Sequence, residues 1–412
     1  MNRAPFFTTT DSALRIAARL AVLALMLPAA AQVSTQTPIS MQETDQRGAE
    51  IFEQTGVTGM VLVVVRGHES MIKTYGETAP GSGKAPDLNS LLRLCSISKV
   101  FTADLLLQLA AEGKVSLTDP LEKYAPHGEA VPSGPDGTPI TLLDLATHTA
   151  GLTREVSSYP RKTPHFTFPD EAFRWNWLPE QKIQITPGTV AAYSNVGFDL
   201  LGDALASATH ESYAKLVHDR LIEPLGMWDT TLSPSPEQCA RLLRDAFDEG
   251  PCTDTQASGP SGGLYTTPND MVKFLRYMLH IPGLPEAPAS LLSIYVKPKQ
   301  LKTMQGLDHA GRPTGIGLAW IQLGDPNGAS MVMEKTGGGA GFSTYIALNP
   351  QKQTGIFAAV TYGKGPENVN FFEESNKVLA ALAGVPPVPA KVHLRRATSR
   401  RGKRRRAAAR KN

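Results

Sequence analysis

Residues 96–109 read SISKVFTADLLLQL, and this stretch has the length and the apolar composition of a buried helix. Ser96 and Lys99 stand at its start. Residues three apart are neighbours on a helix, so the Lys99 amine is expected to reach the Ser96 hydroxyl. A serine hydroxyl becomes a good nucleophile only when a base takes its proton. The stretch therefore predicts a nucleophile and a candidate base on one helix.

The pattern Ser-x-x-Lys is not specific by itself, because it occurs three times, at residues 70–73, 96–99 and 212–215. The first copy lies in a strand-like stretch, where residues three apart point to opposite faces. The third copy fits the start of a surface helix with a solvated lysine. Without further support, even residues 96–99 fit a helix cap followed by a charge.

Two further motifs occur once each and follow in order. Residues 193–195 read YSN, and residues 335–341 read KTGGGAG and lead into the alternating, β-rich segment 342–348. Taken singly, the first fits a turn with a packed tyrosine before a helix, and the second fits a flexible glycine loop. Glycines beside a strand also let a ligand approach the backbone closely. Together the three motifs supply a nucleophile, two amines, a phenol and a glycine-rich strand, which predicts a site for acyl transfer.

With these motifs in this order, the sequence resembles the penicillin-recognising serine hydrolases, which include class C β-lactamases, D-alanyl-D-alanine carboxypeptidases and endopeptidases, and related esterases. The likeness covers about residues 47–385, and includes TLLDLATHTAGL (141–152), GGLYTTPNDM (262–271), DPLEKYAP (119–126) and PLGMWDTT (224–231). It implies an α+β fold, in which an antiparallel sheet is flanked by helices and carries a mainly helical insertion. It also implies a penicillin-binding serine DD-peptidase that acts on peptidoglycan peptides without cofactor or metal.

The resemblance assigns catalytic roles to four side chains. Ser96 attacks the substrate carbonyl and becomes acylated, and Tyr193 shuttles the proton with Lys99. Free lysine and tyrosine titrate near about 10.4 and about 10, so each needs help to act as a base. Lys335 and Lys99 flank the phenol as cations, which favours its ionised form. The three groups are expected to titrate as one coupled unit, and the choice of base between Lys99 and Tyr193 stays open.

The resemblance also implies how the substrate is held. Asn195 would bind its amide, and Lys335 and Thr336 would bind its carboxylate. The oxyanion would accept hydrogen bonds from the backbone N–H groups of Ser96 and Gly338, in the strand that also contains Gly337. Some relatives carry serine where this chain has Gly338. A backbone donor survives that change, whereas a side-chain contact is lost.

Other functions remain as alternatives. Within the enzymes these are a class C-like β-lactamase and a small-ester hydrolase, which differ in how fast water clears the acyl-serine. A catalytically inactive protein that captures penicillin or wall peptides is the non-enzymatic alternative. The segment GPSGG at 259–263 matches a nucleophile-elbow pattern but lacks the strand before it. The segment GSGK at 81–84 lacks the hydroxyl residue of a phosphate loop. His148 is expected to pack in its turn and not to take part in a catalytic triad.

The N-terminal residues 1–31 have the features of a signal peptide: arginines, the short apolar core LAVLALML and the small residues AAA. That core is too short to span a bilayer, although an uncleaved amphipathic anchor stays open. Residues 32–46 are expected to form a polar linker. The mature chain is accordingly expected in the periplasm, either free there or peripheral on the inner membrane.

The formal net charge of +3 hides a strong asymmetry. Residues 1–31 carry +2 and residues 391–412 carry +11, and subtracting both from the total leaves −10 for the segment between them. The segment 386–412 is therefore expected to be a basic, disordered tail. An anionic membrane or an acidic envelope polymer is the partner expected from its charge, with a solvated tail as the alternative. No nucleic-acid partner is expected for an exported protein.

The three cysteines fit an exported chain. Cys239 and Cys252 are 13 residues apart in sequence, and exported chains tend to oxidise such nearby pairs. A disulfide between them would stabilise the fold by about 3 kcal/mol in the chain-entropy model. Cys95 is left over and is expected to be a small buried apolar residue, although it adjoins Ser96.

Strands are expected at both ends of the chain and helices between them. The strands cover 59–66, 71–75, 317–323, 331–335, 342–348 and 355–362, and the helices cover 96–113, 198–207, 204–221, 236–247, 268–280 and 367–383. This order predicts an α/β part made of residues 47–115 and 311–385, and a helical part made of residues 116–310. The active site is expected in the seam between the two parts.

Overall fold

The computed structural model describes residues 1, 36–157, 168–247, 250–307, 309–325 and 328–389. All the helices and strands described lie in the unit that begins at Gln36. The predicted signal peptide beyond Met1 and the basic segment 391–412 fall outside the described residues. Within the residues described, no helix combines the length and the apolar character needed to cross a bilayer.

A seven-stranded antiparallel sheet joins the two ends of the domain, in the order β2-β1-β11-β10-β9-β8-β7. The strands are β1 (Gly59–Arg66), β2 (Glu69–Gly76), β7 (Pro313–Ile316), β8 (Ile321–Leu323), β9 (Val332–Gly339), β10 (Phe342–Asn349) and β11 (Thr354–Thr361). The first and last strands are neighbours, with Gly59 opposite Thr361. The predicted α+β class, with strands from both chain ends in one antiparallel sheet, is confirmed.

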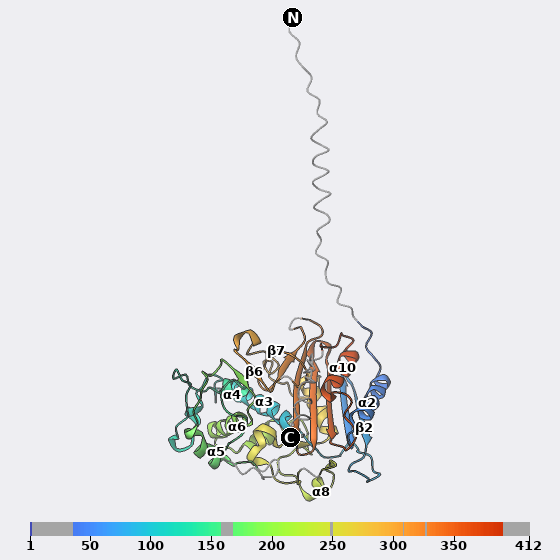
Figure 1. Cartoon of the computed structure of the whole chain (residues 1–412), viewed down its shortest axis with the longest axis horizontal. Coiled ribbons are helices and arrows are strands. Elements are labelled where there is room, and N and C mark those ends of the chain that lie inside the picture. The colour runs from blue at the N-terminus through green and yellow to red at the C-terminus, as the bar shows by residue number, and fades with distance from the viewer. Residues whose placement is uncertain (2–35, 158–167, 248–249, 308, 326–327, 390–412) are drawn as a thin grey trace, which may run out of the picture. The chain divides into compact units, whose positions relative to one another are not determined.

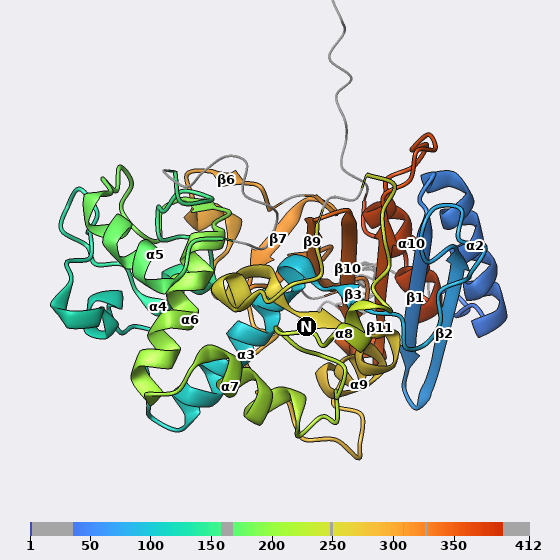
Figure 2. The same cartoon turned by 90° about the horizontal axis from the view of Figure 1, so that it is seen from below.

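Helices cover both faces of this sheet. β1 reads GMVLVVVR and is buried along nearly its whole length, so the side chains on both faces of the strand need apolar cover. On one face, α2 (Met41–Thr55) and α10 (Phe371–Ala383) pack side by side (Figures 1 and 2). On the other face, α9 (Pro268–Met278) packs against β1 and β11. The continuous apolar run in β1 is thereby explained.

Four further helices of the described residues form the second part, with α3 (Ser98–Ala111) between it and the sheet (Figure 2). They are α4 (Leu142–Ala146), α5 (Glu171–Trp177), α6 (Asn195–Thr209) and α7 (Tyr213–Val217). The short α8 (Pro236–Cys239) lies apart from them, on the sheet side of α3. Two small strand pairs complete the fold: β3 (Leu92–Arg93) with β5 (Tyr265–Thr266), and β4 (Ala191–Ala192) with β6 (Met304–Gln305). The pair β3–β5 lies directly before the Ser96 turn and fixes its position.

The predicted linker over residues 32–46 is wrong in its last part, because α2 begins at Met41. Ser40 caps this helix: its hydroxyl accepts a hydrogen bond from the Glu43 backbone N–H at 3.1 Å, and the Glu43 carboxylate accepts the Ser40 N–H at 2.7 Å. This reciprocal capping box was visible in the sequence as Ser-x-x-Glu. The domain therefore begins several residues before residue 47.

Two predicted helices are shorter than expected. The helix over 204–221 divides at His210, whose positive φ of 57° ends α6, and α7 starts afresh with Ser212 as its cap. The helix over 236–247 is helical only in α8. A backbone in the left-handed region ends a helix whatever its side-chain pattern, and hydrophobic periodicity does not reveal it.

The predicted strand over 317–323 agrees with β8 in its last three residues and is wrong in its first part, because Gly317–Trp320 is a turn between β7 and β8. Gly317 N–H donates to the Trp320 carbonyl at 2.8 Å, and Ala319 has a φ of 65°. In the opposite sense, β9 runs past the predicted end at residue 335 and includes the glycines up to Gly339. The predicted helical part 116–310 needs a correction as well, since α9 lies on the sheet.

Candidate active site

Ser96 lies in a tight turn that directly precedes α3. Residues Cys95–Ile97 form one turn of 3-10 helix, and Ser96 is the member of the turn that is not fully buried. Cys95 has a φ of 51°, which is strained for a residue with a side chain. Strain of this kind concentrates at functional sites, where surrounding structure holds it. The serine therefore stands in the turn before the helix rather than within it.

Both candidate bases reach the Ser96 oxygen. The Tyr193 hydroxyl donates to Ser96 Oγ at 2.5 Å, and Lys99 Nζ donates to the same atom at 3.4 Å. Lys99 Nζ also donates to Asn195 Oδ1 at 2.6 Å and to the Ser261 carbonyl. All three ammonium protons thus have acceptors, which fixes the amine beside the serine.

Burial lowers the pKa of both lysines in the site. It lowers the pKa of Lys99 to about 7, against the opposing effect of the Asp199 and Glu155 carboxylates. It also lowers the pKa of Lys335, and the Tyr193 phenol opposes that shift. A lysine whose pKa lies near neutrality is partly free to accept a proton. The site therefore holds one amine that is able to act as a base at neutral pH.

Three cations surround the Tyr193 ring. The distances to the ring centroid are 4.9 Å from Lys99 Nζ, 5.0 Å from Lys335 Nζ and 4.8 Å from the Arg154 guanidinium carbon. The phenol thus lies beside both lysines and in hydrogen-bond contact with Ser96, and the choice of base between Tyr193 and Lys99 stays open.

The strand β9 forms the wall opposite the nucleophile. Its partner β8 pairs with it only as far as Glu334, so within the described residues no strand of the sheet covers the edge from Lys335 to Gly339. Gly337 has no room for a side chain: a Cβ there would lie 2.8 Å from the Leu94 carbonyl oxygen. The glycine thus lets the strand approach the Ser96 turn. An exposed strand edge of this kind can receive an extended peptide.

Asn195 is held at both ends of its amide. Ser194 caps α6 by accepting the Gly197 N–H at 2.9 Å, which places Asn195 as the first residue of the helix. Its Oδ1 accepts from Lys99, and its Nδ2 donates to Glu155 Oε1 at 2.5 Å. A substrate amide that binds Asn195 must therefore compete with Glu155.

A cavity of about 270 Å³ opens over these groups. It is lined by Ser96, Arg154, Tyr193, Gly306, His309, Thr336, Gly337, Gly338, Ser343, Tyr362 and Phe372. The sequence-derived candidates Ser96, Tyr193, Thr336 and Gly338 thus share one cavity, and Lys99, Lys335 and Asn195 reach it through the contacts above. The structure brings all three motifs together.

Sequence reasoning missed four participants: Arg154, Glu155, Asp199 and the Ser261 carbonyl. Asp199 is buried, and its Oδ1 accepts the Ser261 backbone N–H at 3.1 Å. Ser261 in turn holds Lys99 through its carbonyl, so the backbone of this one residue links the carboxylate to the amine. None of these residues belongs to the three catalytic motifs, and only the folded chain brings them beside the serine.

The remaining sequence candidates have structural roles. Lys73 pairs with Asp45 at 2.7 Å, on the outer strand β2. Ser212 caps α7. The GPSGG segment is a buried π-helical turn with no strand before it. His148 is buried, and its Nδ1 accepts the Ser194 N–H at 3.1 Å. These contacts explain each residue without a catalytic role.

Two of the three cysteines form a disulfide, and the third is a free thiol. Cys239 and Cys252 are joined by a disulfide with a Cα–Cα distance of 5.6 Å. Cys95 is a free, buried thiol, and burial raises its pKa to about 12. A thiol that stays protonated is a poor nucleophile. Ser96, and not Cys95, is therefore the nucleophile that the geometry favours.

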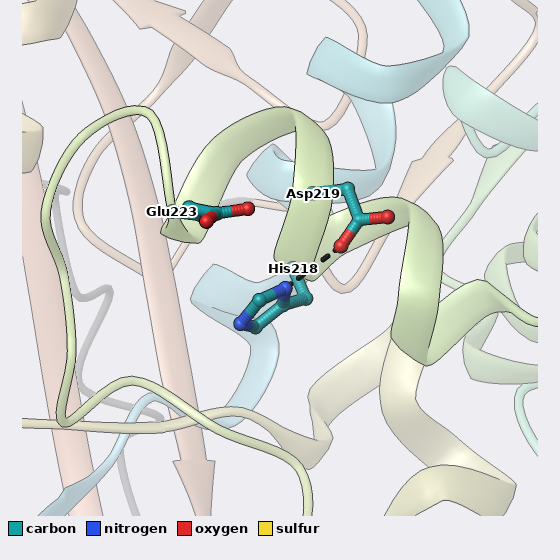
Figure 3. A group of neighbouring side chains, drawn as sticks. All are labelled: His218, Asp219 and Glu223. Carbon is teal, nitrogen blue, oxygen red and sulfur yellow. Dashed lines mark hydrogen bonds and ion pairs between the residues drawn. The ribbon is translucent and has the colours of Figure 1, made fainter.

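One group of metal-ligand types lies away from this site. Figure 3 shows His218, Asp219 and Glu223 on the surface turn after α7, with a hydrogen bond of 2.8 Å between His218 Nδ1 and Asp219 Oδ1. The Lys215 ammonium is ion-paired with the same aspartate. A cation bound there would have to compete with that ammonium, and we assign the group no metal.

A serine held between an amine and a phenol, beside an open strand edge, defines a serine hydrolase that works by acyl transfer. The chain belongs to the Beta-lactamase family, whose model matches residues 42–379. The family prediction is confirmed.

The chain is similar to peptidases and β-lactamases over most of its length. The chain is 38% identical over 361 residues to the D-alanyl-D-alanine-carboxypeptidase/endopeptidase AmpH of Escherichia coli K12, covering 87% of this chain and 94% of that protein. It is 26% identical to a β-lactamase of Lysobacter lactamgenus, covering 76% and 85% of the two chains. A Yersinia pestis β-lactamase/D-alanine carboxypeptidase, crystallised with citrate, superposes with a TM-score of 0.79 at 39% identity, covering 84% of this chain and 99% of that one.

Proposed function

We propose that this protein is a serine DD-peptidase that cleaves D-alanyl-D-alanine termini and cross-links of peptidoglycan peptides through an acyl-Ser96 intermediate. The observation that carries the proposal is the contact of one serine oxygen with both Tyr193, at 2.5 Å, and Lys99, at 3.4 Å. The named similarity to a carboxypeptidase/endopeptidase over most of both chains supports the choice of substrate.

Acylation follows from these contacts. Ser96 Oγ forms a bond to the carbonyl carbon of the penultimate D-alanine, and its proton passes to the Tyr193–Lys99 pair. The carbonyl oxygen becomes an oxyanion, which accepts hydrogen bonds from the N–H groups of Ser96 and Gly338. Backbone donors preorganised in this way typically contribute several kcal/mol in the transition state. The carbon–nitrogen bond then breaks, and the proton moves to the leaving amine.

The leaving residue and water complete the cycle. The Lys335 ammonium and Thr336 bind the terminal carboxylate, which places the scissile bond over Ser96. Asn195 holds the amide on the acyl side once it exchanges its contact with Glu155. After the leaving residue departs, water forms a bond to the acyl carbon and gives a proton to the Tyr193–Lys99 pair. The bond between Ser96 Oγ and the acyl carbon then breaks, the shortened peptide leaves as a carboxylate, and the pair returns the proton to Ser96 Oγ.

Two other outcomes use the same acyl-enzyme. A β-lactamase would release a penicilloyl group quickly, and an esterase would need no carboxylate contact. A protein that only captures penicillin or wall peptide would stop at binding or acylation. Incubation of the purified protein with monomeric muropeptides, cross-linked muropeptides, a chromogenic cephalosporin and an uncharged thioester distinguishes these outcomes. The proposal requires release of D-alanine and cleavage of cross-links, with slower turnover of the cephalosporin.

The proposed location rests on the composition of residues 1–31 and on the charge of residues 391–412. Residues 1–31 would direct export to the periplasm, and the basic segment 391–412 would bind an anionic membrane surface or an acidic envelope polymer. The formal charge of +11 in that segment supports this part of the proposal. The division into a domain from residue 47 to 385 and a tail from 386 to 412 also stays a proposal, with the start moved back to include α2.

A further inference from the structure

A second cavity adjoins the catalytic cavity across the end of the sheet. It has a volume of about 290 Å³. Ser343 and Tyr362 line both cavities, and their hydroxyl oxygens are 3.2 Å apart. The backbone of Tyr362 is fixed, because its N–H donates to the Gly341 carbonyl at 2.8 Å. The two hydroxyls therefore form a shared polar boundary between the two cavities.

The absence of a side chain at Gly338 leaves the path between the cavities open. Ser343 stands directly opposite Gly338 in the pairing of β9 with β10. A Cβ built on Gly338 would lie 4.0 Å from the Tyr362 hydroxyl, so a larger side chain would extend over the boundary. With glycine there, a ligand arm that leaves the oxyanion position can cross β9 toward Tyr362.

The order of groups along β9 shows which half of a substrate would take this path. Lys335, which binds the carboxylate of the leaving residue, stands three residues before Gly338, which binds the oxyanion. The acyl half must extend from the carbonyl in the opposite direction, past Gly338. The second cavity lies at that end of the strand. Its occupant would therefore belong to the acyl half, which monomeric and cross-linked substrates share.

The walls of the second cavity are mostly apolar and preformed. Phe247 is one of the lining residues and is 55% exposed. Its segment is fixed to the residue after β11 by the Ala246 N–H, which donates to the Tyr362 carbonyl at 2.8 Å. Gly365, also in the lining, packs so closely that a Cβ there would lie 2.8 Å from Gly56 Cα. A wall that needs no ordering on binding costs the ligand little entropy.

Among the residues that the structure describes, one charged side chain lines this cavity, the exposed carboxylate of Glu367. The other lining side chains are aromatic, aliphatic or hydroxyl-bearing: Thr55, Val57, Phe247, Ser343, Val360, Tyr362 and Phe371. A mostly apolar cavity with a carboxylate in its lining matches an aliphatic chain that ends in an amine. We propose that the second cavity is a subsite for the acyl-side residue next to the scissile D-alanine, and that it selects a long side chain with a terminal ammonium. This inference rests on the proposed DD-peptidase function.

Three substrates test the subsite: N-acetylated X-D-alanyl-D-alanine with lysine, norleucine or glycine at X. Norleucine keeps the aliphatic chain and lacks the amine. We expect kcat/KM to fall from lysine to norleucine by about two- to fivefold, as for an exposed ion pair, and to fall further for glycine. Glu367→Gln should remove the difference between lysine and norleucine. Phe247→Ala should lower both and leave the glycyl substrate unchanged.

Matched controls and a second readout keep the test decisive. Glu122→Gln and Phe173→Ala change exposed residues outside the cavity and should leave the substrate order intact. Acylation of Ser96 by penicillins with an ε-aminocaproyl or a caproyl side chain gives the same comparison without peptide hydrolysis. If both cavity variants affect all ligands equally, or none, the subsite is refuted. If the penicillins discriminate while no peptide is cleaved, the subsite stands and the DD-peptidase proposal fails.

Discussion

Replacing Lys335 by alanine should separate recognition of a terminal carboxylate from general acyl transfer. A D-alanyl-D-alanine peptide and a penicillin both present a carboxylate near the scissile amide, whereas an uncharged ester has none. Lys335 is 2% exposed, so its ammonium would meet that carboxylate out of contact with bulk water. The ammonium also lies 5.0 Å from the Tyr193 ring centroid, which gives it a second possible influence on the reaction.

The expected magnitude follows from the burial of this charge. Removing one partner of a desolvated charge pair costs about 2–5 kcal/mol. At about 1.4 kcal/mol per tenfold change, kcat/KM should fall by roughly thirty- to several-thousandfold for the peptide and for acylation by penicillin. An uncharged thioester should lose less than about tenfold, because only the effect on Tyr193 applies to it.

The assay measures kcat/KM for D-alanine release and thioester hydrolysis, and the acylation rate for penicillin, on the same preparations. Lys352→Ala, which removes an exposed lysine from the turn after β10, serves as the matched control and should change none of the three. Comparable losses for all three substrates in Lys335→Ala would refute the carboxylate contact. They would mean that Lys335 acts through Tyr193 or Lys99.

Further predictions concern pH, stability and the tail. Asp199→Asn should move the acidic limb of the kcat/KM profile to lower pH, because the Asp199 charge raises the pKa of Lys99 and its loss lets that pKa fall. Replacing Cys239 and Cys252 by serine should lower the free energy of unfolding by about 3 kcal/mol, measured in urea, with native-state activity retained. Truncation after residue 390 should leave the kinetics of soluble substrates unchanged and weaken salt-sensitive binding to anionic vesicles.

Each of the predictions on pH, stability and the tail has an outcome that would contradict it. Asp203→Asn makes the same change one helical turn further along α6, where the carboxylate pairs with Arg174 at 2.6 Å. If both aspartate variants shift the pH profile equally, the Asp199–Ser261 contact has no special role. An unchanged urea midpoint without the disulfide would remove its stabilising role. A severalfold loss of soluble-substrate turnover on truncation would place the tail in the site.

Sequence patterns predicted the parts of this fold that depend on local periodicity. The apolar strand over residues 59–66 and its hairpin partner agree with β1 and β2, and the helix after Ser96 agrees with α3 apart from its start. They failed where a single backbone angle decided the outcome, as at His210 and Ala319. A left-handed residue that is not glycine leaves no periodic signal.

The residues of the active site could likewise be predicted only in part. Its motif residues, such as Ser96 and Lys335, could be predicted because their order along the chain is a pattern in itself. Glu155 and Asp199 could not, because each acts through an intermediate group: Glu155 through the Asn195 amide and Asp199 through a backbone N–H of the Ser261 turn. The sequence around a carboxylate does not show that the folded chain will place it near a buried amine.

Peptide mass spectrometry of the penicillin-treated protein would locate the acyl group. We expect the added mass of the penicillin on the peptide that contains Ser96, and we expect Ser96→Ala to abolish the label while its thermal unfolding stays close to that of the wild type. Label on Ser261 or Cys95, or full labelling of a folded Ser96→Ala protein, would show that Ser96 is not the nucleophile.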